Sequence, residues 1–198
     1  METRTIQITL MEEMLGTASA NPEIFEEFIA SKAPEPEKTT EEEVKALPDV
    51  DEEIQKTTTV FSRDANGNPV LWDYQIKGFF KDACGMLRRV KGTKSAALTA
   101  YKKVIDGLVF VNPRQIPIAF DGEIGFCSRP LRAQTAQGER IALARSETVP
   151  AGSTMVVEIS LLDDKLESVL EEWLDYGKLR GLGQWRNSGK GKFKWSEV

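Results

Sequence analysis

The sequence of 198 residues contains no histidine and only two cysteines, Cys84 and Cys127. The lack of histidine excludes Cys/His zinc sites, Ser-His-Asp and Cys-His catalysis, and a histidine general base. The two cysteines are far apart, one in an apolar helical stretch and one in a strand-like stretch, so we expect both to be buried small hydrophobic residues. The sequence thus assigns no catalytic residue, no metal ligand and no cofactor, which favours a protein that is not an enzyme.

Long apolar runs are also missing. The longest are short, such as residues 107–111, whereas a membrane-spanning helix needs about 20 apolar residues. Residues 1–9 alternate between polar and apolar and lack the apolar core of a signal peptide. We therefore expect a cytoplasmic protein without a membrane partner, and a chain of this length suits a single domain, residues 1–198.

The net charge of −5 argues by itself against binding to nucleic acid. The charge is unevenly placed, however, and local placement decides such binding. Residues 35–53 contain nine acidic residues against two lysines, whereas residues 177–198 contain six basic residues against one glutamate. An acidic segment therefore conceals a basic C-terminal region.

The spacing of apolar residues predicts a strand, a helix, several strands, a second helix, a glycine-rich loop and a closing strand, in that order. This order fits an α+β fold, in which a ferredoxin-like or RNA-recognition-type antiparallel sheet carries helices on one face. An acidic insertion at about residues 33–54 has few apolar side chains, so we expect it to be flexible. The predicted strands are residues 5–10, 56–62, 108–111, 124–129, 140–145, 155–161 and 192–195. The predicted helices are a short one after Asn21, residues 74–90, residues 95–105, and one that Asp163 caps and Gly177 ends.

The segment that points to chemistry is the glycine loop, residues 181–191. Its four glycines allow positive φ angles and leave backbone N–H groups unobstructed, and such groups in a concave turn bind anionic oxygens. Trp185 offers a flat face for a base, and such stacking contributes roughly 1–3 kcal/mol. Asn187 and Ser188 can bond to sugar or phosphate. The predicted RNA-binding residues of this region are Gly181, Gly183, Gln184, Trp185, Arg186, Asn187, Ser188, Gly189, Lys190, Gly191 and Lys192.

Two common phosphate-binding motifs do not fit the glycine loop. A P-loop has four residues between its glycine and a Gly-Lys-Ser/Thr triplet. Here five residues follow Gly183, and Gly191 stands where the hydroxyl belongs. A dinucleotide fingerprint lies between a strand and a helix, whereas this loop follows a helix and precedes a strand. A solvated basic tail remains the alternative interpretation.

Three segments together resemble one protein family. The spacing Gly-apolar-Gly, five residues, Gly-x-Gly-x-Phe resembles the C-terminal glycine-rich loop of the repeat-associated mysterious protein (RAMP) superfamily. Residues 66–81 are similar to that family's turn followed by a Ser-x-x-Lys-Gly helix start, although the serine is absent and Tyr74 and Gln75 stand nearby. Residues 147–152 resemble the family's Val-Pro-Ala-Gly turn before a core strand. The three segments occur in the family's order.

The resemblance implies an RNA-recognition-like fold that binds single-stranded RNA along the sheet, the helix start and the glycine loop. The most similar subfamily is the backbone subunits of CRISPR effector complexes, which line up along a guide RNA. The implied partners are therefore RNA, further copies of the chain and other effector-type subunits. A stand-alone relative from a phage or mobile element is a further interpretation. The resemblance also implies that Lys77, Lys81 and Arg88 face the RNA backbone, and the alternative for them is an ordinary solvated helix face.

Two other functions stay open. The first is a metal-independent endoribonuclease of the same superfamily, some of whose members cut RNA with a loop aspartate. Asp49, Asp51 and Asp64 lie in that region, but no flanking motif selects one, and nothing singles out Tyr74 or a lysine as a general base. The second is a protein-interaction component that keeps the fold without binding RNA, which the acidic segment and the negative net charge suggest.

Overall fold

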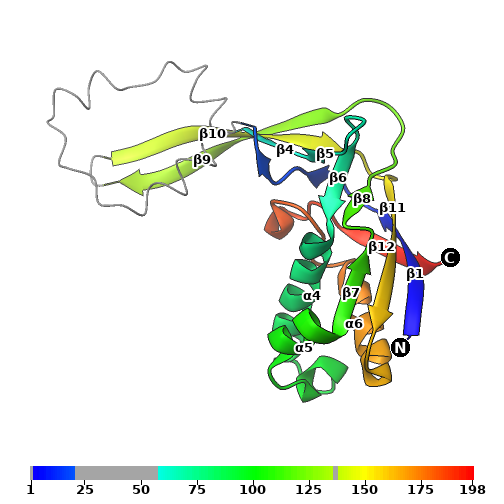
Figure 1. The fold of residues 1–198 in the computed structure, drawn as a ribbon. Helices are drawn as coiled ribbons and strands as arrows, with labels where there is room; N and C mark the ends of the chain where they lie inside the picture. Colours follow the sequence, from blue (N-terminus) through cyan, green and yellow to red (C-terminus); the bar gives the residue numbers. More distant parts are fainter. Residues whose placement is uncertain (1, 21–57, 136–137) are drawn as a thin grey trace, which may run out of the picture.

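A four-stranded antiparallel sheet forms the centre of the computed structural model, which describes residues 2–20, 58–135 and 138–198 (Figure 1). Its strand order is β12 (Phe193–Glu197), β1 (Glu2–Leu10), β11 (Thr154–Leu161) and β7 (Val109–Asn112). Along the chain, β1 is followed by helix α4 (Asp73–Leu87), then by β7 and β11, helix α6 (Glu167–Tyr176) and β12. This is the ferredoxin-like βαββαβ arrangement, so the predicted fold class is confirmed.

The two-residue period of the first strand sets which face of the sheet is buried. Ile6, Ile8 and Leu10 are buried, whereas the residues between them are partly exposed. Ile6 lies opposite Val157 of β11, and Ile8 lies opposite Met155, so apolar side chains of both strands meet on the same face. These pairs form the sheet side of the core.

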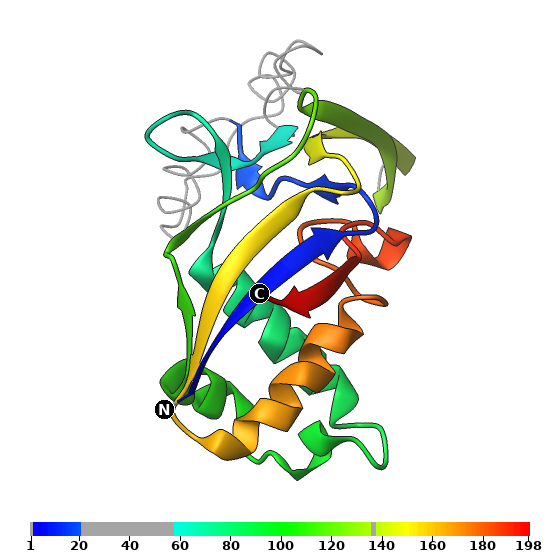
Figure 2. The ribbon, with the colours of Figure 1, turned by 90° about the vertical axis from the view of Figure 1, so that its right-hand side faces the viewer.

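Helices α4 and α6 cover this apolar face (Figure 2). The buried positions of α4 recur at helical spacing and include Phe79 and Phe80. The Phe80 ring lies 5.6 Å from that of Trp173 of α6, which joins the two helices. The start of α4 is fixed by Gln75, whose side-chain oxygen accepts a hydrogen bond from the Trp72 N–H at 2.7 Å. Helix α5 (Tyr101–Leu108) packs beside α4.

The opposite face of the sheet carries mostly polar side chains on its two central strands, and no described helix packs on it. RNA-recognition sheets stack bases on aromatic side chains of this face. The outward side of the two central strands carries no aromatic side chain, but Phe110 of the edge strand β7 lies opposite Ser160 and brings an exposed ring to this face. Glu158 adds a negative charge to the same face. Binding of RNA along the sheet, which the family resemblance implied, stays a prediction. The outward residues are Thr3, Thr5, Gln7 and Thr9 of β1, and Thr154, Val156, Glu158 and Ser160 of β11.

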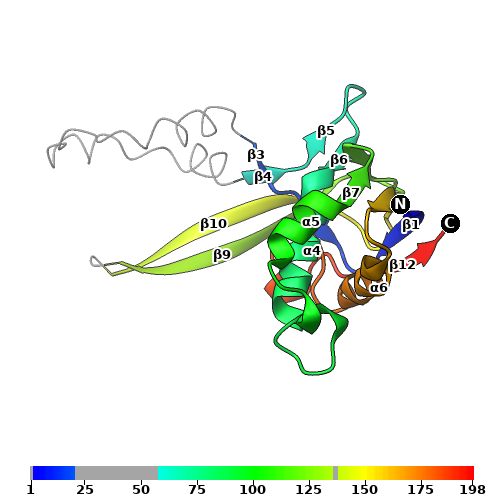
Figure 3. The same ribbon diagram turned by 60° about the horizontal axis from the view of Figure 1, so that its bottom comes forward.

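A long hairpin leaves the body of the protein as an arm, formed by β9 (Gly125–Thr135) and β10 (Gly138–Val149) (Figures 1 and 3). At its root, β10 pairs with β2 (Met14–Leu15) and β4 (Thr58–Val60), and β3 (Ala18–Ser19) pairs with β4. Glu147 fixes the root by accepting hydrogen bonds from the Phe61 N–H at 2.9 Å and the Arg63 guanidinium at 2.6 Å. A small sheet of β5 (Ser62–Arg63), β6 (Pro69–Trp72) and β8 (Gln115–Pro117) lies next to it.

The structure corrects three of the predictions. The helix expected over residues 95–105 is divided into a 3-10 turn (Lys94–Ala97) and α5, because the chain reverses at Ala100, whose φ is +49°. The strands expected over residues 124–129 and 140–145 are parts of the longer arm. Cys84 is buried as expected, but Cys127 lies on the arm and is half-buried. The helix after Asn21 and the insertion at residues 33–54 lie outside the described residues. In the part of the chain that is described, no helix is long and apolar enough to cross a membrane.

Candidate nucleic-acid interface

The glycine loop is closed at its base by backbone hydrogen bonds. The Leu182 N–H donates to the Gly191 carbonyl at 2.8 Å, and the Gly191 N–H donates to the Glu13 carbonyl at 2.8 Å. The Met11 N–H donates to the Lys192 carbonyl at 2.7 Å, which attaches the loop to the end of β1. As predicted, all four glycines of the loop have positive φ angles, between +70° and +86°. The base of the loop is therefore a fixed structure and not a solvated tail.

Close packing at this base requires glycine at three positions, of which Gly181 approaches the Gly191 and Lys190 carbonyls. A Cβ atom on Gly183 would lie 2.6 Å from the Leu15 carbonyl oxygen, and one on Gly191 would overlap the Leu182 carbonyl. The N–H groups of Gly189 and Gly191 are occupied within the protein, by the carbonyls of Arg186 and Glu13. In the described parts of the chain, no backbone carbonyl accepts from the N–H groups of residues 183–187. An anion therefore has donors among these residues and not at Gly189 or Gly191.

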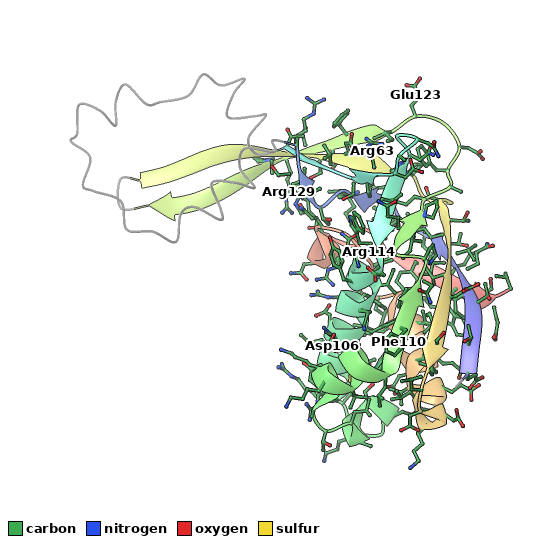
Figure 4. The ribbon with its side chains drawn as sticks, in the orientation of Figure 1. Arg63, Asp106, Phe110, Arg114, Glu123 and Arg129 are labelled. Atoms are coloured by element: carbon green, nitrogen blue, oxygen red, sulfur yellow. The ribbon has the colours of Figure 1, made fainter. Side chains whose placement is uncertain are left out.

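Trp185 is held against the root of the arm. Its φ is +54°, an unusual value for a bulky residue. The guanidinium carbon of Arg129, from β9, lies 3.4 Å from the centre of the indole ring. The Arg129 Nε is buried and has no hydrogen-bond partner among the described residues. Figure 4 shows Arg129 where the arm joins the body. The sequence did not predict Arg129, because nothing local to residues 124–129 indicates contact with the loop.

Three arginines lie around Trp185 and form an arginine cluster, Arg129, Arg180 and Arg186. Asp82 of α4 accepts from Arg180 Nε at 2.8 Å and from Arg186 Nη1 at 2.9 Å through the same oxygen, Oδ2. One carboxylate thus orients two guanidinium groups, and the cluster keeps an excess of positive charge. A cavity of about 570 Å³ opens beside it. Its lining consists of the three arginines and Gly183, Gln184, Trp185, Asn187 and Ser188.

The two lysines of the loop lie at its base. Lys190 forms an ion pair with Glu13, and this hydrogen-bonded carboxylate raises the pKa of the Lys190 ammonium group. Lys192 is partly exposed, and its carbonyl accepts hydrogen bonds from the N–H groups of Met11 and Glu12, which fix the loop to the segment after β1. The loop residues predicted from the sequence are therefore brought together, with Gln184 to Ser188 around the cavity and Lys190 and Lys192 behind it.

The predicted basic face of α4 is directed elsewhere. Lys77 donates to the Asp106 carbonyl at 3.1 Å, and Lys81 pairs with the Asp106 carboxylate at 2.5 Å. The hydrogen bond from Lys81 lowers the pKa of Asp106. Arg88 lies over the Tyr101 ring at 5.2 Å. These three residues thus contact α5 (Figure 4 labels Asp106), whereas Asp82 meets the glycine loop. The structure does not bring the two basic groups together, and RNA contact by Lys77, Lys81 and Arg88 stays a prediction.

Of the acidic residues considered for RNA cleavage, Asp64 lies in the described part of the chain, and its carboxylate holds a turn. Asp64 accepts from the N–H groups of Asn66 and Asn68 at 2.9 and 2.8 Å and closes the turn before β6. Hydrogen bonds from Asn68 lower its pKa. Asp49 and Asp51 lie outside the described residues. Within residues 2–20, 58–135 and 138–198, no group of three His, Cys, Asp or Glu side chains could hold a metal ion.

A second aromatic surface was also missed. The rings of Trp72 and Tyr74 stack with 6.1 Å between centres and 14° between planes, and Arg114 lies 5.7 Å from the Trp72 ring. Tyr74 is 59% exposed. The pair lies at the start of α4, where the sequence predicted a helix start. The spacing of Trp72 and Tyr74, on either side of Asp73, did not predict that the two rings would stack.

Comparison with known proteins gives matches to structures only. No family model matches the sequence, and no curated protein matches it. Among solved structures, 130 chains match. One belongs to the type III-B Cmr-beta complex bound to cognate target RNA, with a TM-score of 0.53 and 12% identity. Another belongs to a type IV-B CRISPR complex, with a TM-score of 0.50 and 10% identity.

The extent of these matches differs between the two complexes. The Cmr-beta match covers 98% of this chain but only 59% of the other. The type IV-B match covers 100% of this chain and 90% of the other. The fold of this protein is therefore one that chains of CRISPR effector complexes share, as the resemblance implied.

Proposed function

We propose that this protein binds single-stranded RNA at the glycine loop, as a subunit of the CRISPR backbone type. The observation that carries the proposal is the convergence of Arg129, Arg180 and Arg186 on Trp185, beside a cavity. Guanidinium groups bind phosphate in a bidentate manner, and an indole ring stacks with any base. Together these groups suit a strand that is held by its backbone and by stacking, with little selection of sequence.

The composition of the cluster also supports a single strand over a duplex, because the unpaired bases of a single strand are free to stack on an aromatic ring. The cluster is assembled from the glycine loop, the arm root and α4. The N–H groups among residues 183–187 supply further donors for phosphate oxygens. The fold is shared with a chain of a complex that is bound to target RNA, which agrees with this choice of ligand. Assembly of several copies side by side along one RNA is part of the same proposal.

The test is a fluorescence-anisotropy titration of the purified protein with single-stranded RNA at two salt concentrations. On single strands, each phosphate contact contributes about −0.7 to the slope of log affinity against log salt. The double variant Arg186→Ala with Lys190→Ala is expected to weaken binding of all sequences about equally and to flatten that slope.

The matched control removes the same charge elsewhere. Lys102 and Lys103 are exposed on α5, away from the glycine loop. Lys102→Ala with Lys103→Ala is expected to retain the affinity of the wild type. Equal affinity in both double variants would contradict the assignment of the loop. A length-dependent footprint on RNA, with several copies bound to long strands, would support assembly side by side.

A further inference from the structure

A smaller pocket lies beside the arginine cluster, between the first half of α4 and the glycine loop. It encloses about 260 Å³, and it shares Gly183 and Arg186 with the larger cavity. Pockets that hold drug-sized ligands usually start at about 300 Å³, so this one suits a single ring system. Its lining consists of Thr17, Leu71, Gln75, Gly78, Phe79, Leu182, Gly183 and Arg186.

The floor of this side pocket is apolar and rigid. Leu71, Phe79 and Leu182 are at most 3% exposed, and Phe79 is fixed by an edge-to-face contact with Phe193, whose ring centre lies 5.1 Å away. The polar wall is fixed as well. Gln75 accepts from the Trp72 N–H at 2.7 Å and donates to the Thr17 hydroxyl at 2.7 Å, so its amide is held in one orientation. A ligand therefore meets a preformed apolar floor beside polar groups whose positions are fixed.

One side of the pocket lacks a side chain. Gly78 is an exposed residue within α4, and a Cβ atom built on it meets nothing within 4 Å. Glycine is a poor residue for a helix interior, by about 0.5–1 kcal/mol relative to alanine. Neither a positive φ nor close packing requires glycine here. The absence of a side chain keeps the entrance of the pocket open.

We propose that the side pocket accepts one nucleobase of the bound strand, while the adjoining phosphate lies on the arginine cluster. This inference rests on the proposed RNA binding. The side pocket and the larger cavity share Gly183 and Arg186, so the apolar pocket lies next to the arginine cluster. This arrangement matches the alternation of base and phosphate along a strand. Because the floor of the pocket consists of Leu71, Phe79 and Leu182, it recognises the ring through apolar contact, so bases bind with little discrimination.

The test compares two helix variants with two RNA strands. Gly78→Leu fills the entrance, and Gly107→Leu is the matched control, since Gly107 also lies in a helix with nothing within 4 Å of a built Cβ. The strands are polyuridine and the same backbone without bases. Gly78→Leu is expected to weaken polyuridine binding roughly tenfold, which is typical of the loss of one stacked base, and to leave binding of the abasic strand unchanged. Gly107→Leu is expected to bind both strands like the wild type.

The other outcomes overturn the inference in distinguishable ways. If Gly78→Leu binds polyuridine like the wild type while the Arg186→Ala, Lys190→Ala variant does not, the pocket takes no base and the RNA site stands. If Gly78→Leu weakens both strands equally, the new side chain obstructs the backbone and no base enters. If the wild type binds neither strand at low salt, the proposed function fails and this inference fails with it. Thermal melting of both glycine variants at or above the wild-type temperature confirms that each is folded.

Discussion

The Arg129 guanidinium lies 3.4 Å from the centre of the Trp185 ring, although the two residues belong to different sheets and loops and are far apart in sequence. The contact joins the root of the arm to the glycine loop. A cation–π pair contributes about 0.5–2 kcal/mol, more where water is excluded. The Arg129 Nε is buried and has no hydrogen-bond partner in the described part of the chain, so the contact with the Trp185 ring is the interaction that the structure shows for this guanidinium group.

The first prediction concerns this pair. Arg129→Ala and Trp185→Ala are each expected to lower RNA affinity about tenfold, since each removes a phosphate or base contact. The double variant is expected to lose less affinity than the product of the two single losses, with a coupling energy of about 1 kcal/mol. A double-mutant cycle in anisotropy titrations measures this coupling energy. Fully additive losses would mean that the two residues act independently on RNA.

The second prediction concerns Asp82, which orients Arg180 and Arg186 but also cancels part of their charge. Asp82→Asn keeps an acceptor oxygen and removes the negative charge. We expect RNA affinity to rise about threefold at low salt, with a steeper salt dependence. Asp164→Asn, an exposed acid at the start of the 3-10 turn before α6, is the control. Weaker binding by Asp82→Asn would show that orientation of the arginines outweighs the gain in charge.

The third prediction separates two requirements for glycine at the base of the loop. Gly191→Ala introduces both a strained φ of +70° and overlap with the Leu182 carbonyl, whereas Gly67→Ala introduces only a strained φ of +85° in open space. We expect a loss of about 1–2 kcal/mol in the free energy of unfolding for Gly67→Ala. For Gly191→Ala we expect about 3 kcal/mol or more. Urea denaturation measures both, and equal losses would mean that the close packing at Gly191 carries no cost.

The fourth prediction concerns acid stability. The Arg4 side chain is 8% exposed and donates to both oxygens of Glu197, at 3.1 and 2.9 Å. The hydrogen bond from Arg4 lowers the pKa of Glu197. A carboxylate whose pKa is lower in the folded state stabilises the fold above its ordinary pKa of about 4.3, and this contribution disappears as the pH falls through the folded value.

Glu197→Gln is therefore expected to be less stable than the wild type near neutral pH. The difference should shrink to nothing in acid, so that the variant shows a flatter loss of stability below about pH 4.3. Urea unfolding at several pH values measures this. Glu158→Gln, on the face of the sheet opposite the helices, is the control. A difference between wild type and Glu197→Gln that stays constant with pH would contradict the role given to the ion pair.

The sheet and its helices could be predicted because their apolar periods are local. Strand β1 alternates at every second residue, and α4 repeats its buried residues at helical spacing. The arm could not be predicted as one hairpin, because pairing of β9 with β10 along their length depends on contacts across the turn. Ala100 adopts a left-handed conformation although no glycine or proline stands there. The division of the helix predicted over residues 95–105 therefore could not be predicted from the sequence.

The site shows the same limit. The glycine loop was identified from its own residues, since positive φ and close approach favour glycine directly. Arg129 and Asp82 were not identified, because their roles come from contacts with residues far along the chain. The shared face of Lys77 and Lys81 was correctly recognised, but periodicity shows which side of a helix is buried in the core and not which neighbour covers its flank. Here that neighbour is α5.

The position of β1 in the sheet also governs how the protein is made. Its partners are β11, at residues 154–161, and β12, at residues 193–197. During synthesis the first strand therefore stays unpaired on both edges until residues 154–161 have been translated. Sheets built from such distant segments fold slowly, and waiting strands with exposed apolar side chains aggregate. For this fold, the interval between translation of β1 and of β11 is the period in which the apolar face and both edges of β1 are exposed to aggregation.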